Sequence, residues 1–145
     1  MRRALFFLLI IFCISCKSEA PVELVEDSQE VVLEPSDEFL TFYDRFHADT
    51  VFQLDHIVFP LQGKPATGMF EGEVKEFKWT REGWTVHKAF KEDDDTFDRQ
   101  FVVHAPELIT EVIYSATYGF YMERRFAKLS DGWNLIYFAD MAKKE

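Results

Sequence analysis

Residues 111–126 read EVIYSATYGFYMERRF, and this stretch decides the fold class. Seven of its apolar side chains share even positions: Val112, Tyr114, Ala116, Tyr118, Phe120, Met122 and Phe126. Successive side chains of a strand point to opposite faces of a sheet, so the alternation predicts one long strand with one face on a core. Gly119 is the expected bend in this strand, because glycine inside a strand often marks a bulge.

The same alternation raises the question of where Arg124 lies. Strict alternation places Arg124 on the face of Met122 and Phe126, where a buried guanidinium needs a charged partner or an anionic ligand. A bulge near Gly119 reverses this parity, leaves Arg124 in water and turns Arg125 inward. We favour the bulge, and we keep Arg124 as a candidate ligand-binding residue for the first arrangement.

A last strand follows the turn at residues 130–132. Alternation divides its apolar side chains into Trp133, Leu135 and Tyr137 on one face and Ile136 and Phe138 on the other. A strand that is apolar on both faces is covered on both. We expect the set with tryptophan to face the core, and the outer face of the sheet to pair with a second copy of the chain. The alternative is that the 62–69 loop or the N-terminal linker covers the outer face.

Several shorter segments upstream complete the expected sheet. Residues 63–68, with Pro65 among them, read as a loop. Pro106 opens a helical turn in one interpretation, but the β-branched residues after it favour a strand from about Glu111. The other expected strands are 56–61, 77–79, 84–90 and 97–103, with a hairpin turn at 80–83.

Two helices are expected before these strands. Ser36 is a suitable N-cap, and the acidic residues after it favour the positive end of a helix. An apolar stripe follows at helical spacing: Phe39, Phe42, Tyr43 and Phe46. Asp49 is expected to cap a second, short turn. Helices followed by a meander of strands predict an α+β fold, with N-terminal helices packed on one face of a curved antiparallel sheet.

The N-terminus predicts an exported, lipid-anchored protein. Arg2 and Arg3 precede an apolar run, Ala4 to Ile14, in the order typical of a signal peptide. This run is shorter than the ~20 residues that a spanning helix needs. Ile14-Ser15-Cys16 resembles the lipobox of bacterial lipoproteins, in which the cysteine carries a diacylglycerol. We therefore expect lipidation of Cys16 and a location in the cell envelope, held on the outer membrane by its lipid.

The rest of the chain divides into a tether and one domain. Residues 1–15 are the expected signal peptide, 16–35 an acidic flexible tether, and 36–145 a single domain. The only two cysteines are Cys13 and Cys16, so no disulfide is expected in the domain. The formal net charge of −10 disfavours nucleic acid as a partner, because phosphate contacts need a basic face.

Three segments carry a resemblance to a known family: FYDRFHADTVFQLDHIVFPL (42–61), EVIYSATYGFYMERRF (111–126) and DGWNLIYF (131–138). They resemble an uncharacterised family of Bacteroidetes lipoproteins, known only as a domain of unknown function. A Phe-Gln pair and an Ile-x-Phe-Pro-Leu string recur in that family, here Phe52-Gln53 and residues 57–61. The family is similar to the nuclear transport factor 2-like and cystatin-like folds, which implies a cone-shaped sheet with a pocket inside. The resemblance implies no activity.

Acid–base chemistry in such a pocket is the enzymatic alternative, as in isomerases and dehydratases of that superfamily. The candidate bases are Asp44, Asp49, His87 and Asp140, and the candidate donors are Tyr43, Tyr114 and Tyr118. The preferred interpretation is a non-enzymatic module that binds a small ligand or a partner protein through Tyr43, Tyr114, Tyr118 and Arg124. A third alternative is a structural subunit whose cavity is filled by its own phenylalanines.

No metal or cofactor is expected. Asp93, Asp95 and Asp98 lack the glycine and the final glutamate of an EF-hand loop, so they read as a solvated hairpin tip. A second acidic and histidine-containing group matches no zinc spacing: His47, Asp49, Asp55 and His56.

Overall fold

The structure, a computed structural model, describes residues 33–66, 76–91 and 96–143. The expected signal peptide (1–15) and nearly all of the expected tether (16–35) lie outside the described residues. Asp93 and Asp95 of the acidic tip also lie outside them. The expected single domain, 36–145, is described except for residues 67–75, 92–95 and 144–145.

The two expected helices are present, with the expected caps. They are α1 (Asp37–Ala48) and α2 (Thr50–Asp55). The hydroxyl of Ser36 accepts a hydrogen bond from the backbone N–H of Phe39 at 3.2 Å, which satisfies one free donor of the first turn. Asp49 ends α1, and its carboxylate accepts the backbone N–H groups of Val51 and Phe52. The apolar stripe of α1 is buried as predicted: Phe39, Phe42, Tyr43 and Phe46.

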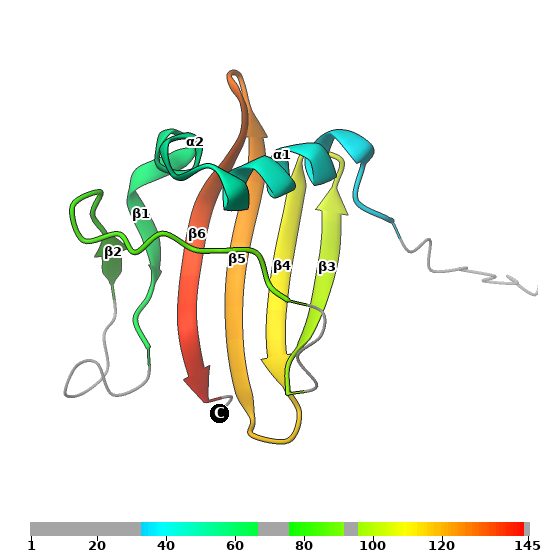
Figure 1. The fold of residues 1–145 in the computed structure, drawn as a ribbon, viewed down its shortest axis with the longest axis vertical. Coiled ribbons are helices and arrows are strands. Elements are labelled where there is room, and N and C mark those ends of the chain that lie inside the picture. The colour runs from blue at the N-terminus through cyan, green and yellow to red at the C-terminus, as the bar shows by residue number, and fades with distance from the viewer. Residues whose placement is uncertain (1–32, 67–75, 92–95, 144–145) are drawn as a thin grey trace, which may run out of the picture. The chain divides into compact units, whose positions relative to one another are not determined.

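The strands form one sheet of six, in the order β2-β1-β6-β5-β4-β3 (Figure 1). The strands are β1 (Ile57–Lys64), β2 (Phe77–Trp79), β3 (Asp98–Ala105), β4 (Leu108–Ser115), β5 (Phe120–Leu129) and β6 (Gly132–Lys143). Neighbours are antiparallel except β1 and β6, which are parallel. Two short helices on a curved, mostly antiparallel sheet confirm the predicted α+β class.

The core lies between the helices and one face of the sheet, which we call the helix face. Figure 1 shows α1 lying across β5, β4 and β3. The ring of Phe39 contacts Phe101 on β3, Phe126 on β5 and Trp133 on β6, with ring centroids 5.0–5.6 Å apart. Burying a phenylalanine of this kind contributes about 1.5–3 kcal/mol, so the stripe of α1 holds the helix on the sheet.

Residues 111–126 are two strands and not the one long strand that we predicted. The chain turns at residues 116–119, where Gly119 has a φ of 67° and its N–H bonds the carbonyl of Ser115 at 2.8 Å. The turn reverses the chain, so even-numbered residues lie on one face of the sheet in β4 and on the other face in β5. Ile113 pairs with Met122 on the helix face, and Val112 therefore lies on the opposite, outer face of the sheet.

The predicted faces of β6 are wrong beyond Leu135. Arg125 pairs with Tyr137, and the next residue, Phe126, pairs with Leu135, so Ile136 is an extra residue at a bulge. The bulge moves Tyr137 to the outer face. Phe138 moves to the helix face, where it is 2% exposed.

Residues 84–91 form no strand, although alternation predicted one. This segment crosses the helix face over β6 and β5 (Figure 1), where Trp84 packs against Phe138. The backbone N–H and C=O of His87 are bonded by the side chain of Gln53 instead of a neighbouring strand. The alternation therefore reflects the burial of Trp84 and not a ladder.

Two strand boundaries also differ from the predictions. β1 continues through Gly63 to Lys64, where a loop was expected. A side chain at 63 is impossible without movement, because its Cβ would lie 1.9 Å from the carbonyl oxygen of Phe138. β4 begins at Leu108, three residues before the expected start, and makes a tight hairpin with β3.

Candidate functional site

Five side chains with polar groups meet on the helix face, and we call them the buried polar cluster: Tyr43, His47, His87, Glu111 and Arg124. Tyr43 and His47 lie four residues apart and therefore on one side of α1. Glu111 and Arg124 face each other across β4 and β5. His87 comes from the segment 84–91.

Glu111 and Arg124 form a buried ion pair in this cluster. Arg124 Nη1 donates to Glu111 Oε2 at 2.8 Å, and the two side chains are 5% and 0% exposed. The hydroxyl of Tyr43 donates to the other carboxylate oxygen, Oε1. Arg124 Nε donates to His87 Nδ1 at 3.3 Å. Each oxygen of the carboxylate therefore has a donor, which a buried charge needs.

Gln53 holds the segment 84–91 over this ion pair. Its side-chain Nε2 donates to the carbonyls of Phe46 at 2.8 Å and His87 at 2.7 Å. Its Oε1 accepts the indole N–H of Trp84 at 3.2 Å and the backbone N–H of His87 at 2.9 Å. Gln53 is 0% exposed, so these bonds join α1, α2 and the segment in a dry environment.

Burial keeps the aromatic members of the cluster uncharged. It lowers the pKa of His47 to about 4 and that of His87 to about 3, and the positive charge of Arg124 lowers both further. Burial also raises the pKa of Tyr43, and the negative charge of Glu111 acts in the same direction. At neutral pH the cluster thus holds one anion, one cation and three neutral side chains.

His47 is the member with an unused polar atom. Its Nδ1 lies 3.2 Å from the carbonyl of His87 and donates to it when it carries the proton. Its Nε2 is buried and has no hydrogen-bond partner in the described part of the chain. The other members are paired with one another, so the buried charges have partners and the cluster stabilises the fold.

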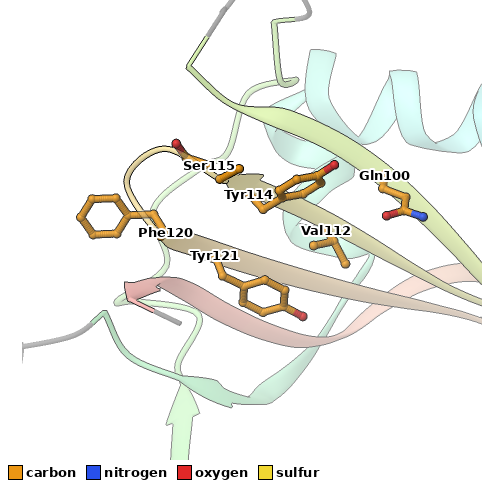
Figure 2. Close-up of a pocket in the computed structure, with 8 residues that line it drawn as sticks. Gln100, Val112, Tyr114, Ser115, Phe120 and Tyr121 are labelled. Carbon is orange, nitrogen blue, oxygen red and sulfur yellow. The ribbon is translucent and has the colours of Figure 1, made fainter. Parts of the chain in front are cut away.

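A hollow of about 460 Å³ lies at the end of the sheet where β4 turns into β5 (Figure 2). We call it the outer hollow, because Val112 and Tyr114 on its wall have the parity of the outer face. None of its lining residues carries a charge. They are Gln100, Val112, Tyr114, Ser115, Ala116, Gly119, Phe120 and Tyr121.

The two tyrosines of the outer hollow are direct cross-strand partners. Such partners have Cβ atoms about 5 Å apart and commonly touch. Tyr114 and Tyr121, however, make no ring contact with each other in the described structure. Figure 2 shows both rings on one side of the strands, with Val112 beside them. The hydroxyl of Tyr121 donates to Glu123 Oε2 at 3.0 Å, and burial raises the pKa of Tyr121 to about 12.

The residues that the sequence selected as ligand contacts fall in three places. Tyr43 and Arg124 meet in the buried polar cluster, joined through Glu111. Tyr114 lines the outer hollow. Tyr118 lies in the turn between β4 and β5, is 58% exposed and is not part of the lining.

The favoured position of Arg124 in water was wrong. Arg124 is 4% exposed and faces the helices, as strict alternation within β5 requires. Arg125 faces outward, pairs with Glu123 at 2.6 Å and lies over the ring of Tyr137. The expected bulge occurs in β6 and not near Gly119, so it leaves the parity of β5 unchanged.

Of the four candidate bases, only His87 belongs to the buried polar cluster. Asp49 is used as the cap of α2, and Asp44 is exposed. Asp140 accepts the backbone N–H of Met141 at 2.7 Å.

The group considered as metal ligands is also dispersed. Asp55 pairs with Arg81 at 2.9 Å, and His56 Nδ1 lies 2.8 Å from the carbonyl of Phe52. No group of three or more histidine, cysteine or acidic side chains in the described ranges is placed to hold a metal ion.

Sequence reasoning missed Glu111, Gln53, Gln100 and Tyr121. A signal for Glu111 was present in the sequence. A hairpin turn at 116–119 would have placed Glu111 opposite Arg124, and opposite charges are favoured in such pairs. For Gln53 the signal was its place in the Phe-Gln pair, which fits the structural role that its bonds show. Nothing local distinguishes Gln100 or Tyr121.

The arrangement of helices and sheet is that of known solved structures. The chain is similar to an NTF2-like protein from Bacteroides fragilis, with a TM-score of 0.52 and 18% identity over 74% of this chain and 48% of that one. It therefore spans about half the length of that protein. A cystatin-like protein from Bacteroides caccae matches with a TM-score of 0.49 and 22% identity, over 79% of this chain and 80% of that one. At such identities the likeness shows the fold, which is NTF2-like. No protein-family model matches the sequence, and no curated protein matches it significantly.

Proposed function

We propose that this protein is a lipoprotein of the cell envelope whose NTF2-like domain is a non-catalytic binding module, with its ligand site in the outer hollow. The observation that carries the proposal is the hollow itself. It has an uncharged wall with two tyrosines and a volume of about 460 Å³, within the usual range of ligand sites. The proposal moves the site from the expected interior of the cone to the outer face of the sheet.

The two alternatives rest on the side chains of the helix face. An acid–base enzyme would use Tyr43, Glu111 and His87, but these groups are bonded within the cluster, and Glu111 is 0% exposed. A structural subunit would fill its interior with its own side chains, as Phe39, Phe46 and Phe126 do here at 0% exposed. The filled interior supports the structural role for the helix face, and it leaves the outer face for binding.

A ligand screen by NMR tests the position of the site. We expect ligands to shift the ring resonances of Tyr114 and Tyr121 in the full chain labelled at tyrosine, while those of the buried Tyr43 stay in place. The screen uses fragments of neutral, anionic, cationic and purely apolar character. Shifts confined to Tyr43 would overturn the proposal in favour of an interior site, and a screen without any shift would overturn the binding function.

The envelope location rests on the sequence alone, on the signal-like run and on Cys16. No helix in the described residues is long and apolar enough to cross a membrane. We expect Cys16→Ala to abolish acylation, because the substitution removes the thiol to which the lipid is attached. Detergent phase partitioning measures this: the wild-type chain enters the detergent phase, and the soluble product of the variant stays in the aqueous phase. Equal partitioning of both chains would contradict a lipid on Cys16.

The expected self-association through the outer face stays a prediction. Tyr137 and not Phe138 would take part in it, because the bulge in β6 exchanges the faces of these two residues. Trp133 and Leu135 face the core as expected, at 3% and 0% exposed.

A further inference from the structure

The chemistry of the outer hollow restricts the charge of its ligand. None of the eight lining residues carries an ionised side chain. The neighbouring carboxylate, Glu123, is already bonded by the hydroxyl of Tyr121 at 3.0 Å and by Arg125 Nη2 at 2.6 Å. An anion would find no cation in the wall and would approach a chain of net charge −10. No carboxylate lies in the wall for a cation to pair with. The lining therefore favours a neutral ligand.

The polar groups of the wall require a ligand that both donates and accepts hydrogen bonds. The side-chain amide of Gln100 and the hydroxyl of Tyr114 have no hydrogen-bond partner in the described structure, and each offers a donor and an acceptor. The hydroxyl of Tyr121 donates its hydrogen bond to Glu123, so only its oxygen remains available to a ligand, as an acceptor. A hydrocarbon chain would desolvate these groups without replacing their bonds, at a cost for each one.

The remaining wall is apolar and presents ring surfaces. Val112 lies beside the rings of Tyr114 and Tyr121, whereas the ring of Phe120, which also lines the hollow, points away from them (Figure 2). An aromatic face binds a flat apolar surface, and a pyranose ring has such a surface of C–H groups bordered by hydroxyls. Hydroxyls at the rim both donate and accept, which is what Gln100 and Tyr114 can satisfy.

We propose that the outer hollow binds a neutral saccharide, with a sugar ring against the tyrosines and its hydroxyls bonded by Gln100 and Tyr114. This inference rests on the proposed function, because it names the ligand class of the same site. The turn at 116–119 contributes two small residues to the lining, Ala116 and Gly119.

Calorimetric titration of the full chain tests the ligand class. The chain is kept in a detergent that has no sugar headgroup, and the probes are cellobiose, maltose and glucose, with glucuronate and glucosamine as the charged counterparts of glucose. We expect at least one neutral sugar to bind, and both charged sugars to bind about tenfold more weakly than glucose or not at all. Tighter binding of glucuronate would overturn the argument from charge.

Two tyrosine variants provide the matched comparison. Tyr114→Ala should weaken disaccharide binding by about tenfold, as expected for the loss of an aromatic contact and a hydrogen bond. Tyr118 lies four residues after Tyr114, is exposed and is not part of the lining. Tyr118→Ala should therefore change binding by less than about twofold. Equal losses in both variants would overturn the placement of the sugar in the hollow.

The saccharide inference and the proposed function fail in different ways. If no disaccharide binds but another neutral fragment shifts the resonances of Tyr114 and Tyr121, the sugar is wrong and the binding site stands. If neither the sugars nor any fragment perturbs these tyrosines, both proposals are overturned.

Discussion

Replacing Arg124 with methionine should lower the free energy of unfolding by about 3–5 kcal/mol, because it leaves the charge of Glu111 buried without its cation. Glu111 is 0% exposed, and the hydroxyl of Tyr43 would be its one remaining donor among the bonds described here. Methionine has a similar length to arginine and fills much of the same space. The loss therefore reports the unpaired charge more than a cavity.

Arg125 is the matched control, one residue away on the same strand. Its side chain is 41% exposed, and its ion pair with Glu123 lies on the outer face. Exposed pairs of this kind contribute about 0–1 kcal/mol, so Arg125→Met should have a small effect. Urea denaturation of the full chain measures both variants. Similar losses for the two would contradict the assigned role of the buried pair.

A double variant separates the charge from the packing. Replacing Glu111 with leucine in the Arg124→Met background removes the stranded carboxylate, so much of the lost stability should return. Glu111→Leu alone should be as damaging as Arg124→Met, because it leaves the guanidinium without its carboxylate. A double variant that is no better than the single ones would show that the position tolerates only polar side chains.

The helices could be predicted because their signals are local. Ser36 and Asp49 cap the helices through bonds that span three residues or fewer, and the stripe of α1 repeats every turn. The parity of residues 111–126 could not be carried across Gly119, because a four-residue turn joins two strands there. Alternation within each strand holds. The choice between a bend and a hairpin depends on the pairing of β4 with β5, which is a tertiary property.

The sites show the same division between local and long-range signals. Tyr43 was selected because it lies on the buried stripe, but its partner Glu111 is 68 residues away. The bonds of Gln53 to His87 join residues 34 apart and replace a predicted strand by an irregular segment. The outer hollow combines side chains of β3, β4 and β5 around one turn, so it exists only once the register of three strands is set.

Acid should destabilise the protein through His47 in a pH range above the titration of ordinary carboxylates. In the folded chain burial lowers the pKa of His47 to about 4, whereas in the unfolded chain it has its ordinary value of 6.5. At a pH between these two pKa values, His47 binds a proton in the unfolded state but not in the folded state. The free energy of unfolding therefore falls as the pH falls from 6.5 towards 4, and no such loss occurs above pH 6.5.

The expected size of this effect decides how it is measured. One such histidine costs about 1.4 kcal/mol per pH unit, so His47 alone should remove about 2 kcal/mol between pH 6.5 and 5. His87, whose pKa is about 3, acts in the same direction but is partly exposed. Urea denaturation at pH 7, 6.5, 6 and 5 gives the slope.

The variant His47→Asn tests whether the slope belongs to His47. An asparagine amide can still donate to the carbonyl of His87, as Nδ1 of His47 does at 3.2 Å when it carries the proton, but the amide does not titrate. The variant should lose stability at pH 7, because its smaller side chain packs less well between Tyr43 and Phe46. Its stability should nevertheless fall less steeply than that of the wild type between pH 6.5 and 5. Parallel slopes in the two chains would mean that His47 is protonated in the folded state or that its burial is lost in solution.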